Sequence, residues 1–296
     1  MSRTDTDPTD TDLTDTDLGP FLEAVYQRFH NADSVADDPL SVPTAYSDAL
    51  DREVMGFIAA AFAFGRVQAF MAKLACLRDR LGQSPASRIA GLDEKGCMAV
   101  GSGIRHRFVG EGETASLLHG IACLLRRDGG LKPSFDRGLC TNGNIVDGLE
   151  SLLFGIWPAD IETSLPGPGF LLASVRAGSP LKRLNMFLRW MVRDDGIDLG
   201  LWTNVPTGSL IIPLDTHVFR IARFLGLLPT RRSGPRLKDA IQLTDALRRY
   251  DREDPVRFDF ALSHLGISGG CRGRFHETTC PNCPLSPVCR ESQVGH

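Results

Sequence analysis

Apolar residues in this chain recur every three to four positions, which is the spacing of one face of an α-helix. Segment 56–64 (GFIAAAFAF) is apolar on every side and predicts a central buried helix. Glycine and proline separate the helical segments, and no run alternates like a strand with hairpin turns. The pattern predicts an all-α protein, with helices in segments 51–81, 113–127, 144–155, 181–193, 215–225, 236–250 and 255–265.

The N-terminal segment differs in composition from the rest of the chain. Residues 4–18 repeat TDTDP, TDTDL and TDTDL with almost nothing to bury, so we expect residues 1–17 to be a disordered acidic tail. A solubilising role is the simpler interpretation, and an acidic competitor for a polyanion is the alternative. The whole chain has a net charge of −3, whereas residues 18–296 hold 32 basic and 30 acidic side chains. This balance is compatible with a local basic face.

The compartment follows from hydropathy and cysteine usage. No apolar run reaches the roughly 18 residues that a membrane span needs, and the acidic N-terminus is unlike a secretory signal. We therefore expect a cytoplasmic monomer with no membrane partner. Thiols stay reduced in that compartment, so the eight cysteines do not imply disulfides. The scattered cysteines 76, 97, 123 and 140 are interpreted as small core residues.

The last four cysteines form the strongest chemical motif. Cys271, Cys280, Cys283 and Cys289 follow the pattern C-x(8)-C-x(2)-C-x(5)-C, so one short segment can bring four thiolates to a metal centre. Structural zinc sites usually pair two short knuckles, and only one is present here. The wider loops favour an iron–sulfur cluster, with zinc as the alternative. The first loop carries Arg272 and Arg274, which are either solvated charges or contacts to a phosphate backbone.

A second motif is the segment GSPLKRLNMFLRWMVR. Ser179 is a candidate N-cap and Pro180 suits the first helical position. The apolar stripe of Leu181, Leu184, Leu188 and Met191 leaves Lys182, Asn185, Arg189 and Arg193 on the other side. The helix dipole disfavours cations in the first turn, which favours a neutral, nucleophilic amine at Lys182. The same turn, with Ser179 and Arg183, could bind a phosphate. A merely solvated lysine is the alternative.

A third motif is LDTHVFRIARFLG, which predicts a helix from Thr216 to Leu225 with Asp215 as its N-cap. A carboxylate at a helix N-terminus is stabilised as the anion and is held in place by its neighbours. It could therefore stabilise a developing cation in a cleft. His217 is a candidate base, although packing is the usual role of a histidine at this position.

These three motifs, in this order, resemble the helix-hairpin-helix DNA glycosylase superfamily, in its endonuclease III-like iron–sulfur branch. The likeness covers residues 48–292 as an architecture, and about 45 residues carry it in detail. It implies an all-α; two-lobed helix-hairpin-helix DNA glycosylase-like fold with a C-terminal [4Fe-4S] cluster loop. It also implies that Asp215 is the catalytic aspartate, that Lys182 is the lyase lysine and that the four C-terminal cysteines are the cluster ligands. The chain as a whole most resembles a bacterial family of this type whose domain has no assigned function.

The sequence also departs from the superfamily pattern. The Gly-Val-Gly of the hairpin is replaced by Gly178-Ser179-Pro180, and proline cannot donate a backbone hydrogen bond to a phosphate. Lys182 and Asp215 stand 33 residues apart, which is farther than in endonuclease III and closer to archaeal 8-oxoguanine glycosylases. The first cysteine loop is two residues longer than the superfamily pattern.

The resemblance implies a domain division and a function. The expected parts are the tail at 1–17, an N-terminal helix at 18–47 packing with the C-terminal lobe, a helical domain with the hairpin-helix motif at 48–205, and the catalytic-aspartate and cluster lobe at 206–292. The implied function is a base-excision-repair DNA glycosylase, with an AP lyase step through Lys182, acting on double-stranded DNA at the nucleoid. The expected DNA contacts are Ser179, Arg183, Arg189, Arg272 and Arg274.

Two other interpretations remain open at this stage. One is a non-catalytic DNA- or RNA-binding protein on a glycosylase-like iron–sulfur scaffold. The other is a zinc-stabilised helical module without a nucleic-acid partner. The tryptophans at 157, 190 and 202 are candidates for stacking on a flipped base, but core packing is their usual role. The lesion cannot be named from one sequence.

Overall fold

The computed structural model describes residues 17–31, 35–36, 38–172, 174–229, 234–267 and 270–293. Within these ranges the chain forms fourteen α-helices and no strand, so the all-α prediction is confirmed. The predicted disordered tail lies outside the described residues, apart from Asp17. No helix in the described part is both long enough and apolar enough to cross a membrane.

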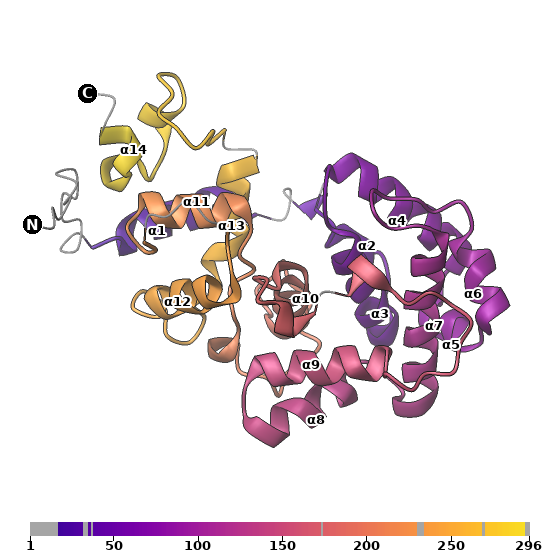
Figure 1. The fold of residues 1–296 in the computed structure, drawn as a ribbon. Helices are drawn as coiled ribbons and strands as arrows, with labels where there is room; N and C mark the ends of the chain where they lie inside the picture. Colours follow the sequence, from indigo (N-terminus) through magenta and orange to yellow (C-terminus); the bar gives the residue numbers. More distant parts are fainter. Residues whose placement is uncertain are drawn as a thin grey trace, which may run out of the picture.

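The helices gather in two lobes with one helix between them (Figure 1). One lobe holds α2 (Ser41–Thr44), α3 (Ala49–Phe62), α4 (Val67–Leu81), α5 (Pro85–Ala90), α6 (Glu94–Gly101) and α7 (Glu111–Asp128). The other holds α1 (Gly19–Phe29), α11 (Thr216–Phe224), α12 (Leu237–Leu247), α13 (Phe258–Ile267) and α14 (Arg290–Gln293). The pair α8 (Lys132–Asn142) and α9 (Ile145–Ile156) lies at the base, and α10 (Lys182–Val192) runs between the lobes.

Helix α3 is the central helix of its lobe, as its apolar sequence predicts. Asp48 caps its N-terminus by accepting from the amides of Leu50 and Asp51, and every residue from Glu53 to Phe62 is buried. The Glu53 carboxylate accepts three hydrogen bonds: from the amides of Leu131 and Lys132 at 2.8 and 3.2 Å, and from the Trp202 indole at 2.8 Å. These bonds join three distant segments of the chain, and burial raises the pKa of Glu53.

The helix predicted for 51–81 is wrong in one respect, because α3 and α4 are separate. The chain leaves the helix at Ala63 and turns at Gly65, whose φ of +82° is a left-handed conformation that favours glycine. The flanking apolar residues kept the helical period, so periodicity alone did not mark the turn. The turn leaves Arg66 and Val67 exposed at the surface.

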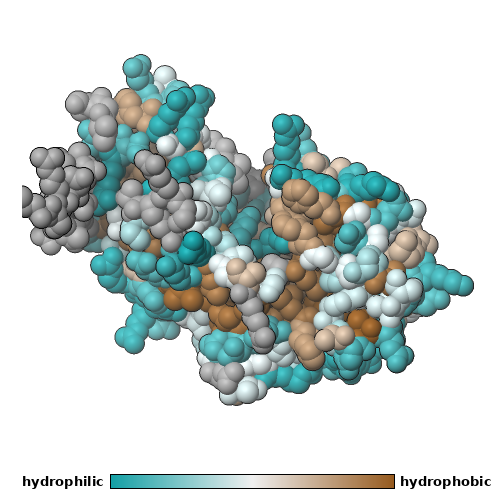
Figure 2. Space-filling view, in the orientation of Figure 1, coloured by the Kyte–Doolittle hydropathy of each residue, from teal (hydrophilic) through white to brown (hydrophobic). Residues whose placement is uncertain are grey.

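N-terminal helix α1 packs against α13, although the two are more than 200 residues apart in the sequence. Helix α10 packs against α3 and reaches the other lobe through its polar side chains. Figure 2 shows apolar side chains gathered in the middle of one face, where the lobes meet, while the outer ends are largely hydrophilic. Helix α10, which begins at Lys182, is thus the element that joins the two lobes.

Candidate functional site

Asp215 begins α11 as its sequence predicts. Its Oδ1 accepts from the amides of His217 and Val218, both at 2.8 Å, which is the geometry of a helix N-cap. Its Oδ2 accepts no hydrogen bond from any described residue, and the side chain is half-buried. The buried segment before it is held by the Ile212 amide, which donates to Thr244 Oγ1 at 3.0 Å. The result is a fixed carboxylate with one oxygen available.

Lys182 lies at the first position of α10, after a tight turn. The turn contains Gly178 at φ +70° and Leu181 at φ +52°, and Leu181 is buried in that left-handed conformation. Ser179 and Pro180 precede the helix, so the prediction of Ser179 as the N-cap is wrong. The left-handed Leu181 interrupts the helix that the sequence pattern extends. The Leu237 amide donates to the Gly178 carbonyl at 3.2 Å, which docks the turn against the start of α12.

Asp259 of α13 is a buried carboxylate on which the charges of both Lys182 and Asp215 act. It is 4% exposed and accepts from Arg189 Nη1 at 2.6 Å. Burial raises the pKa of Asp259 to about 6; the charge of Arg189 lowers it, that of Asp215 raises it, and that of Lys182 lowers it. Coulomb interactions fall off with distance, so Lys182 and Asp215 each lie near enough to Asp259 for their charges to act on it. Asp259 was not predicted from the sequence. Its signal there is a single acidic residue inside the mainly apolar run VRFDFALSHL, where a charge needs a partner.

Arg189 was predicted to contact DNA, and that prediction is wrong. Its side chain is 4% exposed and forms ion pairs with Asp259 at 2.6 Å and Asp198 at 3.2 Å. The prediction failed because residues 184–192 of α10 are all buried, so the helix has no solvent face there. The polar stripe of α10 instead faces carboxylates from distant segments.

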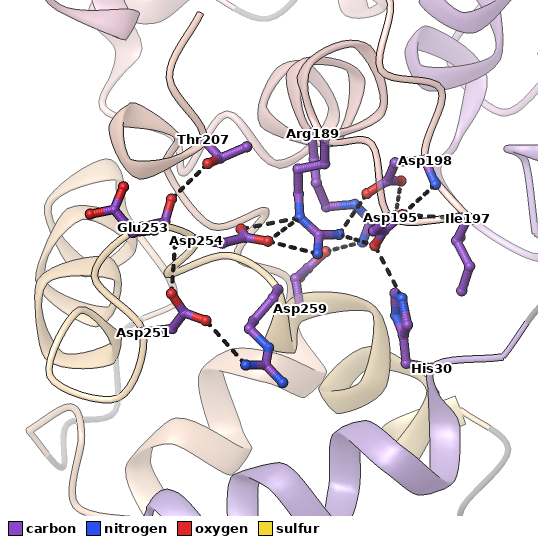
Figure 3. A network of polar contacts seen from close by, with 12 residues as sticks. His30, Arg189, Asp195, Ile197, Asp198, Thr207, Asp251, Glu253, Asp254 and Asp259 are labelled. Atoms are coloured by element: carbon purple, nitrogen blue, oxygen red, sulfur yellow. Dashed lines mark hydrogen bonds and ion pairs between the residues drawn. The ribbon is translucent and has the colours of Figure 1, made fainter. Parts of the chain in front are cut away.

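Those carboxylates belong to a buried ion-pair network, drawn in Figure 3. Arg193 is 2% exposed and contacts Asp195 at 2.7 Å, Asp198 at 2.8 Å and Asp254 at 2.9 Å. His30, at the end of α1, lies 3.0 Å from Asp195. Although burial acts to raise it, the hydrogen bond from His30 and the charge of Arg193 hold the pKa of Asp195 below its usual range. The network therefore fastens α1 and α13 to α10 and the segment that follows it.

Arg183 is also occupied within the protein. Its guanidinium donates to the carbonyl oxygens of Ala61 and, at 2.5 Å, Phe170, and burial lowers its pKa to about 10. A phosphate contact through Arg183 would have to break these bonds. Of the other three predicted DNA contacts, Ser179 is half-buried in the turn before α10, and Arg272 and Arg274 are exposed on either side of Gly273.

The four C-terminal cysteines lie in one loop after α13, each partly buried. Burial raises the pKa of Cys283, and the charges of Cys271, Cys289 and Cys280 act in the same direction. The His276 amide donates to Cys280 Sγ at 3.2 Å. All four thiols are free, and among the described residues no three His, Cys, Asp or Glu side chains are arranged to hold a metal ion.

The cysteine loop (residues 270–293) is fastened to α11 and α1. At Gly273, with φ +73°, a Cβ would lie 2.3 Å from Arg220 Nε, so the Arg220 side chain of α11 lies directly over the loop. Arg28 of α1 donates to the Asn282 carbonyl at 2.9 Å. A cavity of about 190 Å³ between α1 and the loop is lined by Arg28, Phe29, Leu265, Thr278, Thr279, Asn282, Cys283 and Pro284.

His217 and two of the tryptophans have packing roles. His217 lies against Gly266 of α13, where a Cβ would come 2.8 Å from the histidine Cβ, and its Nδ1 contacts Arg220 Nη2 at 3.2 Å. Trp190 and Trp202 are 0% and 1% exposed, so they cannot stack on an extruded base. Trp157 is half-buried beside Gly167.

Over the part of the chain that the structure describes, the protein is all-helical, with Lys182 at the start of α10, Asp215 at the start of α11 and a cysteine-rich loop after α13. The chain belongs to the family described as Protein of unknown function (DUF2400), whose model matches residues 38–268. That match includes Lys182, Asp215 and Asp259 and ends before Cys271. No curated protein and no solved structure matches the chain.

Proposed function

We propose that this protein is a DNA glycosylase of the helix-hairpin-helix type that removes a damaged base from duplex DNA and then cleaves the abasic strand. The observation that carries the proposal is the fixed carboxylate of Asp215, whose second oxygen no described residue engages. Lys182 lies 33 residues earlier in sequence, and the charges of both residues act on the buried Asp259. An amine and a fixed carboxylate in one place are what excision with a lyase step requires.

The chemistry begins with extrusion of the base, which costs a few kcal/mol and least for a damaged or mispaired one. Asp215 Oδ2, which no described residue engages, stabilises the positive charge that develops on the sugar as the N-glycosidic bond breaks. The base leaves with the bonding electrons and takes up a proton. Lys182, after losing its own proton, forms a bond from Nζ to C1′. The sugar ring opens to a Schiff base, and loss of a C2′ proton eliminates the 3′ phosphate.

The cofactor proposed with this function is a [4Fe-4S] cluster held by Cys271, Cys280, Cys283 and Cys289, with zinc as the alternative. The chemistry of the donor set supports this, because four free thiols in one loop, with the His276 amide donating to Cys280 Sγ, are the ligand type that such a cluster takes; the side chains would have to close around it. When bound, the cluster would hold the loop in a fixed conformation and would perform no redox step. The residues of the loop present Arg272 and Arg274, whose exposed side chains would contact phosphates.

The enzymatic test is borohydride trapping on duplexes that carry 8-oxoguanine, uracil, an oxidised pyrimidine or an abasic site. We expect a covalent adduct with the parent and with Lys238→Ala, a control that removes an exposed lysine of α12, and none with Lys182→Ala. Asp215→Asn keeps the helix cap but removes the charge, so base release should fall while the fold is retained. Trapping that survives Lys182→Ala would eliminate the lyase assignment, and full base release by Asp215→Asn would eliminate the catalytic carboxylate.

The cofactor is tested on the purified protein by metal analysis and visible absorbance. A brown protein with about four irons per chain supports the cluster, and Cys283→Ser should lose the iron. A colourless protein with one zinc per chain would exclude it.

A second candidate function is non-catalytic nucleic-acid binding. It is favoured by the hairpin, where Pro180 has no amide to donate and Arg183 is bonded to protein carbonyls. This candidate predicts salt-dependent binding without base release, and binding that is unaffected by Lys182→Ala or Asp215→Asn.

A further inference from the structure

Three phenylalanines from three separate segments form an exposed cluster on the α3 lobe. Phe64 follows α3, Phe108 lies in the turn between His106 and Val109, and Phe170 belongs to the short 3-10 helix η3 (Gly169–Leu171). The ring centroids of Phe64 and Phe170 are 4.8 Å apart, and those of Phe108 and Phe170 are 5.7 Å apart, both edge to face. Phe108 is 70% exposed and Phe170 is 48% exposed. A contiguous group of exposed aromatic rings, unlike a single exposed ring, is typical of a binding surface.

Arg183 joins this cluster to the start of α10. Its guanidinium carbon lies 5.2 Å from the Phe64 ring centroid and 4.8 Å from that of Phe170. The guanidinium therefore stacks on the protein-facing side of both rings, and its hydrogen bonds to Ala61 and Phe170 keep it there. We call these four residues (Phe64, Phe108, Phe170 and Arg183) the aromatic–arginine cluster. Since Lys182 is the neighbour of Arg183 in the chain, the cluster is connected directly to the candidate site.

The turn that carries Phe108 is held rigidly. His106 and Val109 exchange two backbone hydrogen bonds, at 2.8 and 2.9 Å, and His106 Nε2 contacts the Phe64 carbonyl at 2.7 Å. Between them Arg107 adopts φ +53°, a conformation that a non-glycine residue rarely takes. The backbone is thus fixed so that the Phe108 ring projects into solvent.

The charge around the aromatic–arginine cluster selects its occupant. Arg66, Arg105 and Arg107 are exposed beside it, and Arg107 lies 5.4 Å from the Phe108 ring centroid. Of these three arginines, only Arg105 has an acidic partner among the described residues, Glu111 at 3.4 Å. Flat apolar rings beside guanidinium groups, two of which have no such partner, fit a polyanion with exposed aromatic faces. That description matches the unpaired bases of a nucleic-acid strand.

We infer that the aromatic–arginine cluster is a stacking site for an unpaired nucleobase, with Arg66, Arg105 and Arg107 contacting the adjoining phosphates. The inference rests on the proposed association with DNA and adds the part of the strand that is recognised. A base beside an extruded nucleotide, or opposite a missing one, has an open face, whereas paired bases are already stacked. The cluster therefore gives preference for interrupted duplexes over intact ones.

The test uses the full-length protein and a duplex with 2-aminopurine opposite an abasic site, compared with the intact duplex and with single-stranded DNA and RNA of the same sequence. Anisotropy gives the affinity, and 2-aminopurine fluorescence reports stacking. We expect the parent to quench the fluorophore and to prefer the interrupted duplex. Phe108→Ala and Phe170→Ala should each weaken that binding about ten-fold, and Phe108→Trp should retain it.

Phe154→Ala is the matched control, because Phe154 is 62% exposed on α9, outside the cluster, and its loss should change nothing. Preference for the single-stranded RNA over DNA would identify RNA as the strand and still support stacking. Equal binding by Phe108→Ala, Phe170→Ala and the parent would overturn the inference, as would absence of binding to every nucleic acid. The assay is independent of excision: stacking without base release would refute the proposed enzyme alone, and excision insensitive to Phe108→Ala would refute only the stacking site.

Discussion

Replacing Arg189 by methionine would leave the buried carboxylates Asp198 and Asp259 beside an apolar side chain. Asp198 would keep Arg193 at 2.8 Å, but Asp259 would lose the one ion-pair partner that the described residues offer it. Removal of one partner from a buried ion pair costs about 3–5 kcal/mol. Because one of the two carboxylates stays paired, we expect a loss of about 3 kcal/mol, which lowers the melting temperature by about 6–12 °C.

The loss of stability in Arg189→Met should depend on pH in a definite direction. Burial raises the pKa of Asp259 to about 6 in the folded protein, above the ordinary value of about 4 for aspartate. The stability that comes with the protonated form is complete below about pH 4 and is lost as the pH rises through about 6. Without Arg189 the pKa of this carboxyl rises further, so the deficit of Arg189→Met should be larger at about pH 8 than at about pH 5.

Urea unfolding followed by circular dichroism measures both effects. The double variant Arg189→Met with Asp259→Leu removes the unpaired charge and should recover most of the loss, because apolar replacement of a whole buried pair is close to neutral. Arg88→Met is the control, since Arg88 is exposed on α5. A loss below about 1 kcal/mol at about pH 8, or a double variant less stable than the single one, would refute the reasoning.

Asp215→Ala should lower the free energy of unfolding by about 1 kcal/mol through loss of the α11 cap, while Asp215→Asn should not; equal losses in urea unfolding would contradict the capping role. Gly266→Ala places a methyl group 2.8 Å from His217 Cβ and should cost about 1–3 kcal/mol, measured by thermal melting against Gly234→Ala, where a Cβ would meet nothing within 4 Å. The hydrogen bond from Arg127 lowers the pKa of Asp128 to about 2, although burial opposes it. The stabilisation by the ionised Asp128 carboxylate is present above about pH 4 and is lost toward about pH 2. Asp128→Asn should therefore be about 1 kcal/mol less stable than the parent at neutral pH, after solvent screening, and as stable as the parent in acid. A constant difference across that range would exclude this origin.

The parts of the fold that depend on neighbouring residues could be predicted from the sequence. The Asp215 cap and the helix after it could be predicted from a few adjacent positions. The apolar sequence of α3 likewise predicts that this helix is buried. The environment of α10 could not be predicted, because a polar stripe has the same period whether it faces water or carboxylates. The partners of Arg189 and Arg193 include Asp254 and Asp259, which lie 61 and 70 residues away. The left-handed Leu181 was equally hidden, since no local signal marks a leucine for that conformation.

The ion pairs of α10 have a consequence for how the candidate site is aligned. One residue of an α-helix corresponds to a rotation of about 100°, so a slip of one position in α10 would turn Arg189 away from Asp198 and Asp259. Arg193, directly after the helix, would be displaced from Asp195, Asp198 and Asp254. The apolar side chains of α10 alone would tolerate small rotations, because dispersion contacts are weakly directional. The ion pairs of these two arginines therefore fix the rotation of α10 about its own axis. The angle of Lys182 about the helix axis, at the first position of α10, is therefore set by ion pairs more than a full turn away.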